Sequence, residues 1–423
     1  MNKLIFFIGI FISFLSLICF FIYRSFAIID FINLFLLINF IIGLLIILLK
    51  KFRIIIFINY FLSILVIYSF NLFLYFNDTR KIQNSTILNQ VFETEKDRIN
   101  KKDIWPSITP SYLLNETNLD IYPLGSFVNR NIILCQEDEK VEIKTDKFGF
   151  NNFNEVYKLK KPSVILGDSY GFGGCVSHKN DFSFILNSLG INNINFSISG
   201  SSIIVQTAIF LEYAKNNIDF NEVYLFLSLE NDIPESKNEA SSYYNLYTEK
   251  SFKSQNLIKK EKEINKLYEK QVNNLKNYSF NLSFLRQIIF LIHLRKYFGL
   301  ISSTKEYADR SNIMDTYYNP NLLKLDQIIG NNKLTVIIIP SRHETFRLKN
   351  HKLFLQERKN LINFLNKNKI KYIDLINIFN TKNYDENRNL YTLNGNGHFN
   401  KNGHKKIAYF LFHKFSKKNN SQN

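Results

Sequence analysis

The sequence predicts an α/β protein with a parallel sheet, preceded by three transmembrane helices. Three apolar runs with almost no charge cover residues 4–22, 31–49 and 54–76. Each is close to the ~20 residues with which a helix spans a bilayer, whereas a cleaved signal peptide would account for the first run alone. From residue 163 onward, short apolar runs alternate with helical stretches. That alternation is typical of a parallel sheet with helices on both faces.

Charges in the short loops predict how the chain crosses the membrane. Residues 50–53 carry Lys and Arg between the second and third runs, whereas Arg24 is balanced by Asp30 in the first loop. Short loops rich in Lys and Arg stay in the cytoplasm. We therefore expect a multi-pass protein of the inner (cytoplasmic) membrane, whose chain after Phe76 faces the periplasm or the cell exterior.

The excess of basic residues is spread along the chain. The formal net charge of +17 suggests an anionic partner, such as nucleic acid or a lipid surface. Lys and Arg are not gathered with aromatic residues in a compact run, as a nucleic-acid site requires. The sequence contains no zinc-ligand spacing, no GxxxxGK[ST] and no GxGxxG. We expect the bilayer as a partner, and no nucleic acid, cofactor or metal.

The chain divides by composition into three parts. Residues 1–76 form the transmembrane region, residues 77–160 a linker with a small hairpin (NIILCQ and KVEIKT), and residues 161–423 the α/β domain. The expected strands are Val164–Leu166, Ile194–Ile198, Val223–Ser228, Leu334–Ile339 and Tyr372–Leu375, and the expected helices are Asp181–Leu189, Ser202–Lys215, Glu357–Lys367 and Lys401–Lys414.

A helical insertion is expected at about residues 235–330, where the alternation of strand and helix stops. Residues 250–276 are dense in Lys, Glu and Asn and predict an exposed helix. Residues 284–297 (FLRQIIFLIHLRKY) are apolar with basic ends. This segment either lies in the membrane interface or packs on its own domain, and we favour the second interpretation.

Four short blocks at the ends of predicted strands carry residues suited to acyl transfer from an ester. Ser169 is the candidate nucleophile and His398 the base that removes its proton. The backbone amides of Ser169 and Gly200 and the side-chain amide of Asn231 are candidates for an oxyanion hole. The blocks are GDSYG (167–171), SISGSS (197–202), SLENDI (228–233) and NGNGHFNKNGH (394–404).

With these residues in this order, the sequence resembles the SGNH or GDSL hydrolase family, over about residues 163–233 and 334–415. The resemblance implies a three-layer α/β/α, flavodoxin-like domain that removes or transfers acyl groups, often acetyl groups on sugars. The membrane-anchored layout resembles family members encoded with bacterial surface-polysaccharide genes. It implies an acylated carbohydrate or glycan as substrate and the envelope polysaccharide machinery as a partner.

One position departs from the family pattern. The family has an aspartate two or three residues before the histidine, where this chain has Asn396 and Gly395. Asn396 can accept a hydrogen bond from the imidazole but brings no charge, so the site is either a slow enzyme or receives another acid, with Asp385 as a candidate. The alternative is a degenerate domain that serves as a carbohydrate-binding or assembly component of an envelope polysaccharide system.

Two further pairs of residues are candidates. His343 and Glu344 follow the predicted strand Leu334–Ile339, where they could bind substrate. Cys135 and Cys175 both lie in the predicted outer domain, where disulfides persist. A bridge between them would brace the loop after Ser169. Spacing alone does not separate that bridge from two unrelated buried thiols.

Overall fold

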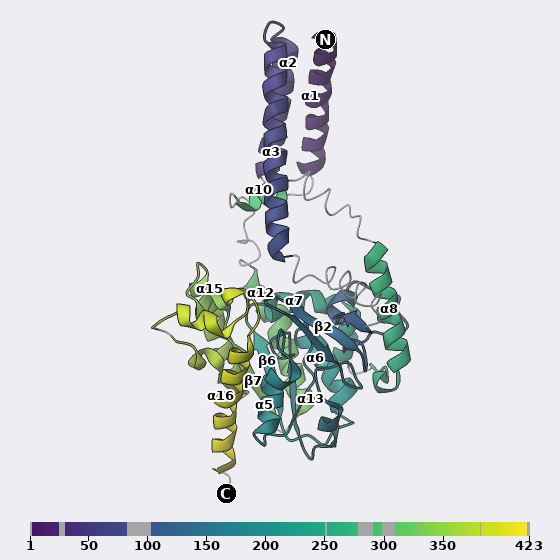
Figure 1. Ribbon diagram of the computed structural model, residues 1–423, viewed down its shortest axis with the longest axis vertical. Coiled ribbons are helices and arrows are strands. Elements are labelled where there is room, and N and C mark those ends of the chain that lie inside the picture. The colour runs from purple at the N-terminus through teal and green to yellow at the C-terminus, as the bar shows by residue number, and fades with distance from the viewer. Residues whose placement is uncertain are drawn as a thin grey trace. The chain divides into compact units, whose positions relative to one another are not determined.

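The computed structural model describes residues 2–24, 30–82, 103–249, 252–277, 291–297, 309–330, 332–380 and 382–420 (Figure 1). The chain forms two compact units. One unit contains Met1–Gln83 and Phe280–Lys305, and the other contains Asn84–Ser279 and Glu306–Asn423.

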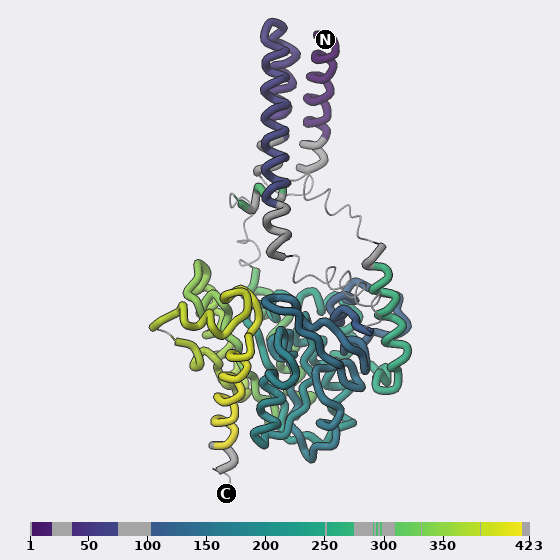
Figure 2. Tube along the Cα trace, in the orientation of Figure 1, coloured from purple at the N-terminus to yellow at the C-terminus, as the bar shows by residue number. Residues whose placement is uncertain are grey.

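The first unit is built on three apolar helices that pack against one another. They are α1 (Asn2–Arg24), α2 (Asp30–Leu48) and α3 (Arg53–Ile82), and they coincide with the three predicted runs. The N-terminal helix, in purple, runs alongside the other two, which overlap in this view (Figure 2). Helices α1 and α2 approach closely at Gly9 and Gly43. A Cβ on Gly43 would lie only 2.9 Å from the carbonyl oxygen of Gly9, so the contact needs glycine there. Small residues at such contacts are typical of helices packed in a membrane.

One of these helices is long and apolar enough to cross a membrane within the described residues. It is the segment Arg53–Leu74 of α3. The described apolar parts of the other two helices, Asn2–Ile18 and Leu36–Leu48, are shorter. The structure therefore shows one candidate span, and three spans remain a prediction.

The described part of the apolar segment 284–297 packs on α3. It forms α10 (Ile292–Tyr297), in which the backbone N–H of Leu294 donates to Asn71 Oδ1 at 3.0 Å. The Tyr297 ring lies 5.8 Å from that of Phe70, edge to face. The expectation that this segment packs on the α/β domain is therefore wrong for α10, and residues 284–290 lie outside the described residues.

The second unit is built on a five-stranded sheet in which all strands are parallel, as predicted. Its order is β5-β4-β6-β7-β8. Of these five strands, β4 comes first in the chain. It pairs with the second, β5, on one side and with the third, β6, on the other. The strand order therefore reverses between β4 and β6, which is where doubly wound folds bind their ligands. The strands are β4 (Ser163–Gly167), β5 (Asn193–Asn195), β6 (Val223–Ser228), β7 (Leu334–Ile339) and β8 (Lys371–Asp374).

Helices cover both faces of the sheet, because successive side chains of its strands alternate between two cores. Val164 and Leu166 of β4 pack on one side with α6, α13 and α15, whereas Ile165 packs on the other with α5 and α16. The bounds are α5 (Phe182–Ser188), α6 (Ile203–Ile209), α13 (Asn319–Ile329), α15 (His351–Lys367) and α16 (Lys401–Asn420).

The predicted hairpin belongs to a second, smaller sheet that shares the core of the large one. Strand β2 (Asn131–Gln136) pairs antiparallel with β3 (Lys140–Lys144) and parallel with β1 (Ile104–Pro106). Buried Phe127 and Ile132 belong to the same apolar cluster as β4. The segment 103–160 is therefore continuous with the α/β core.

The expected insertion also contributes to this core. Helix α8 (Glu261–Asn277) buries one face, and the Tyr268 hydroxyl donates to the carbonyl of Gly125 at 2.6 Å. Helices α7 (Asp232–Ala240) and α12 (Arg310–Ile313) follow β6 and precede α13. Because α13 buries Leu322 and Leu325 against the sheet, it is a crossover helix of the fold, and the expected insertion ends before it.

Candidate active site

The candidate nucleophile stands on a tight turn just beyond strand β4, which lies between β5 and β6. Asp168 Oδ1 accepts the backbone N–H of Tyr170 at 2.9 Å, which shapes the turn. Gly171 fits there because a Cβ on it would lie 2.6 Å from Ser197 Oγ. Ser169 is thus held at the carboxyl end of the sheet, beside the point where the strand order reverses.

His398 reaches Ser169 from the loop before α16. Its Nε2 lies 2.8 Å from Ser169 Oγ, within the range for proton transfer. The backbone N–H of Thr392 donates to the His398 carbonyl at 2.8 Å, which fixes the loop. The structure therefore brings together the serine and the histidine that the sequence proposed.

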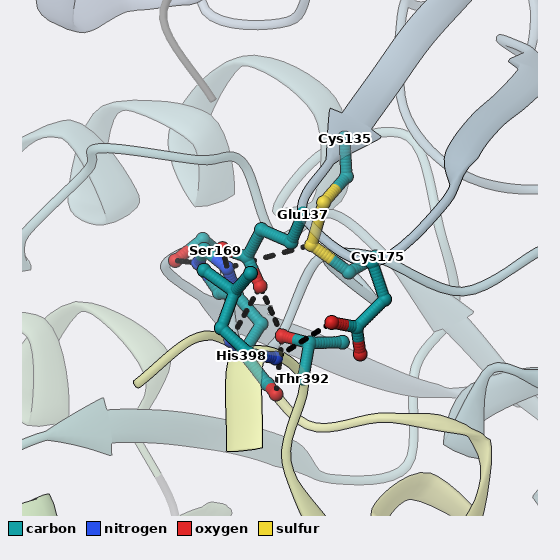
Figure 3. The surroundings of a disulfide bond; sticks show 8 residues. Cys135, Glu137, Ser169, Cys175, Thr392 and His398 are labelled. Atoms are coloured by element: carbon teal, nitrogen blue, oxygen red, sulfur yellow. Dashed lines mark hydrogen bonds and ion pairs between the residues drawn. A yellow bond between two sulfur atoms is a disulfide. The ribbon is translucent and has the colours of Figure 1, made fainter. Parts of the chain in front are cut away.

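A third residue, Glu137, completes the arrangement (Figure 3). Its Oε1 lies 2.7 Å from His398 Nδ1. Its Oε2 accepts the backbone N–H of His398 at 2.9 Å and the hydroxyl of Thr392. Ser169, His398 and Glu137 therefore form a chain of hydrogen bonds in which a carboxylate orients the imidazole and balances its charge.

Glu137 stays ionised in this position. Burial alone would raise the pKa of Glu137, but the hydrogen bond and charge of His398, with the Thr392 hydroxyl, lower it to about 2. The loop leaves room for this contact at Gly397, where a Cβ would collide with Glu137 Oε2. The carboxylate is therefore negative at neutral pH.

Neither of the two residues that the sequence suggested as partners of His398, Asn396 and Asp385, contacts its imidazole. Asn396 is exposed, and its backbone carbonyl accepts from the Arg342 guanidinium, while Nδ1 of His398 is already bonded to Glu137. The side chain of Asp385 is 90% exposed and pairs with Arg388 at 3.3 Å. Sequence reasoning missed Glu137 because it lies 261 residues before His398. A signal was present, since Glu137 directly follows β2, two residues after Cys135, the cysteine proposed to bridge to the loop of Ser169.

A disulfide joins the acid to the nucleophile loop. Cys135 at the end of β2 is bonded to Cys175, 40 residues later, and Cys175 Sγ lies 3.6 Å from His398 Nδ1. Among the described residues, Cys135, Glu137 and Cys175 are the group of His, Cys, Asp or Glu compact enough for a metal ion. The bridge uses both thiolates, so this group is not suited to a metal.

The proposed oxyanion donors lie at the same edge of the sheet. Within the described residues, the backbone N–H groups of Ser169 and Gly200 make no hydrogen bond. Asn231 Nδ2 lies 3.3 Å from Asp168 Oδ2, which directs the amide nitrogen toward the nucleophile turn. Gly200 has φ +69°, a conformation that favours glycine. Two backbone donors and one side-chain amide are thus available near Ser169.

An arginine ties the loops of the site together. Arg342 Nη2 lies 2.6 Å from Glu230 Oε1, next to Asn231, and Nη1 donates to the carbonyl of Asn396, near His398. Because one guanidinium binds the loops after β6 and before α16, it fixes the loop of Asn231 relative to that of His398.

His343 and Glu344 form part of a short helix, α14 (Arg342–Thr345), and both contact α15. Glu344 Oε1 lies 2.8 Å from Arg358 Nε, with only 4% of its side chain exposed. The His343 ring stacks on Phe354, with ring centres 4.9 Å apart. The structure shows that this pair packs against α15, and its role in substrate binding stays a prediction.

Buried carboxyl groups gather between the nucleophile turn and α7. Burial, with the charges of Asp168 and Glu239, raises the pKa of Glu235 to about 8. Burial also raises the pKa of Asp168 to about 6 and that of Glu239 to about 7. The folded protein therefore holds protons that the unfolded chain releases.

These groups predict that the protein loses stability as the pH rises. The raised pKa of Glu235 contributes stability that is fully present below pH 4.5, the usual pKa of Glu. This stability is lost as the pH rises through about 8. At about pH 9, Glu235→Gln should be more stable than wild type by roughly 1–3 kcal/mol. Thermal unfolding followed through the single tryptophan, Trp105, checks this. Exposed Glu263→Gln is the control, and equal pH dependence in wild type and Glu235→Gln would contradict the prediction.

No family model matches the chain, and no curated protein matches it.

Proposed function

We propose that this protein is a membrane-anchored, extracytoplasmic serine esterase or O-acyltransferase of the SGNH type, acting on acyl groups, acetyl above all, of envelope carbohydrate. The observation that carries the proposal is the hydrogen-bonded series Ser169, His398 and Glu137. The strand order and the positions of Gly200 and Asn231 also support the resemblance to that family.

The geometry suits a two-step mechanism. Ser169 Oγ attacks the ester carbonyl carbon while His398 Nε2 takes the hydroxyl proton. Amides of Ser169, Gly200 and Asn231 bind the developing oxyanion. The bond to the alcohol oxygen then breaks, and His398 returns the proton to that oxygen. Water or a sugar hydroxyl next attacks the acyl-enzyme and gives its proton to His398, which passes it to Ser169 Oγ as the acyl bond breaks.

The first unit and the disulfide support an extracytoplasmic placement. Large apolar side chains are exposed along all three N-terminal helices, for example Phe7, Leu48 and Val66, as expected where lipid replaces water. The Cys135–Cys175 bridge suits an oxidising compartment. These observations support three spans, a cytoplasmic N-terminus and a catalytic unit outside.

Labelling with a fluorophosphonate tests the proposal. The full-length protein in detergent should be labelled, and Ser169→Ala should not, because only an activated serine reacts. Ser241→Ala, at an exposed serine in the same unit, serves as the control and should be labelled like wild type. Failure of folded wild type to label would favour the alternative of a non-catalytic carbohydrate-binding or assembly component. Its main support from sequence, the missing acid, is weakened by Glu137.

A further inference from the structure

A small pocket of about 260 Å³ opens beside the base and the oxyanion donors. His398 and Gly200 both line it. Part of its wall comes from the segment 107–112, which lies between β1 and β2, outside the part of the chain that resembles a hydrolase. A molecule in this pocket would therefore touch the catalytic groups and a region particular to this chain.

The contact with His398 indicates which part of an ester the pocket holds. In acyl transfer, the imidazole passes its proton to the leaving alcohol oxygen and later takes one from the accepting hydroxyl. The group nearest to His398 is therefore the alcohol, in the donor ester or in the acceptor. A pocket lined by His398 is therefore suited to the alcohol part of an ester.

The lining suits a neutral, hydroxyl-rich alcohol. Ser107, Ser111 and Ser199 contribute hydroxyl groups, and Thr109 Oγ1 lies 2.9 Å from Ser111 Oγ, next to Gly200. Leu134 is the one aliphatic side chain among the described lining residues, which include no Lys or Arg. Since the carboxylate of Glu137 also lines the pocket, an anionic ligand would be repelled there, even though the chain carries a net charge of +17.

Tyr112 offers an aromatic surface to such a ligand. It lines the pocket with 45% of its surface exposed. An exposed tyrosine gives a broad apolar ring with a polar end, which fits the apolar face of a sugar ring beside its hydroxyl groups.

We propose that this pocket is the alcohol-side subsite, that it binds a neutral sugar next to His398, and that Tyr112 is a specificity-determining residue. The inference rests on the proposed function. It adds that the alcohol is an uncharged sugar, and that the segment 107–112 selects it.

Two acetate esters test this in the full-length protein in detergent. The esters are p-nitrophenyl acetate and 6-O-acetyl methyl glucoside. Tyr112→Ala should raise KM for the sugar ester about tenfold more than for the nitrophenyl ester, whereas Tyr112→Phe, which keeps the ring, should stay within about threefold of wild type. Tyr409→Ala, with a similar exposed fraction of 43% on α16, is the control. An equal change for both esters in Tyr112→Ala would overturn the inference and leave the proposed function standing.

Binding gives a readout that does not depend on catalysis. In a Ser169→Ala background, saturation-transfer NMR with methyl glucoside, methyl galactoside and methyl mannoside should show binding that Tyr112→Ala removes, and methyl glucuronide should bind more weakly. If wild type cleaves neither ester, the proposed function fails. The NMR binding result then decides the inference by itself. Absence of binding by all three neutral glycosides, or binding that survives Tyr112→Ala, would overturn it.

Discussion

Replacing Glu137 by Gln should lower kcat by ~10³–10⁴ while the protein stays folded. Gln keeps the shape of the side chain but removes the charge that balances the imidazolium. Its amide can also present N–H to His398 Nδ1, which favours the tautomer with the proton on Nε2. That tautomer cannot accept the proton of Ser169, and the matching change in serine proteases costs ~10⁴ in kcat.

The control for this experiment is Asn396→Ala. Asn396 contacts Arg342 through its backbone carbonyl, which the substitution retains, so we expect kcat within about threefold of wild type. Hydrolysis of p-nitrophenyl acetate gives kcat, and the Trp105 fluorescence of each variant checks folding. A large loss in Asn396→Ala together with near-normal Glu137→Gln would show that Glu137 is not the catalytic acid.

The parallel sheet was predictable because its strands are buried on both faces. Strands β6 and β7 begin and end at the predicted residues, Val223–Ser228 and Leu334–Ile339, because both runs are mostly apolar and buried along their whole length. Strand β5 is shorter than predicted, covering Asn193–Asn195. The chain beyond it, toward Ile198, keeps hydrogen bonds to β4 but leaves the ladder to bring Gly200 to the site.

The acid of the site was not predictable by the same reasoning. Ser169, Gly200, Asn231 and His398 each follow a strand or precede a helix of the repeating pattern, so their blocks mark a common edge. Glu137 comes from the small hairpin, and only tertiary packing places that hairpin against the nucleophile loop. A bond between Cys135 and Cys175 would place the hairpin against the nucleophile loop, but spacing alone does not establish that these two cysteines pair.

Loss of the Cys135–Cys175 bridge should weaken both stability and catalysis. The bridge closes a loop of 40 residues, for which the chain-entropy relation gives about 4 kcal/mol. Because Glu137 is two residues from Cys135, a looser hairpin also lets the carboxylate move away from His398. We expect the double variant Cys135→Ser/Cys175→Ser to unfold at a lower temperature, with kcat reduced more than tenfold.

A reductant separates this effect from side effects of the substitutions. Tris(carboxyethyl)phosphine should lower the Trp105 unfolding midpoint and the kcat of wild type, and should leave the double variant unchanged. Cys19→Ser, which alters the third cysteine of the sequence, should respond to the reductant as wild type does. If the bridge were lost with full kcat, Glu137 would be held by its contacts with His398 and Thr392 alone. A fall in kcat that parallels loss of the bridge would instead mean that the oxidation state of these two thiols decides whether the triad is complete.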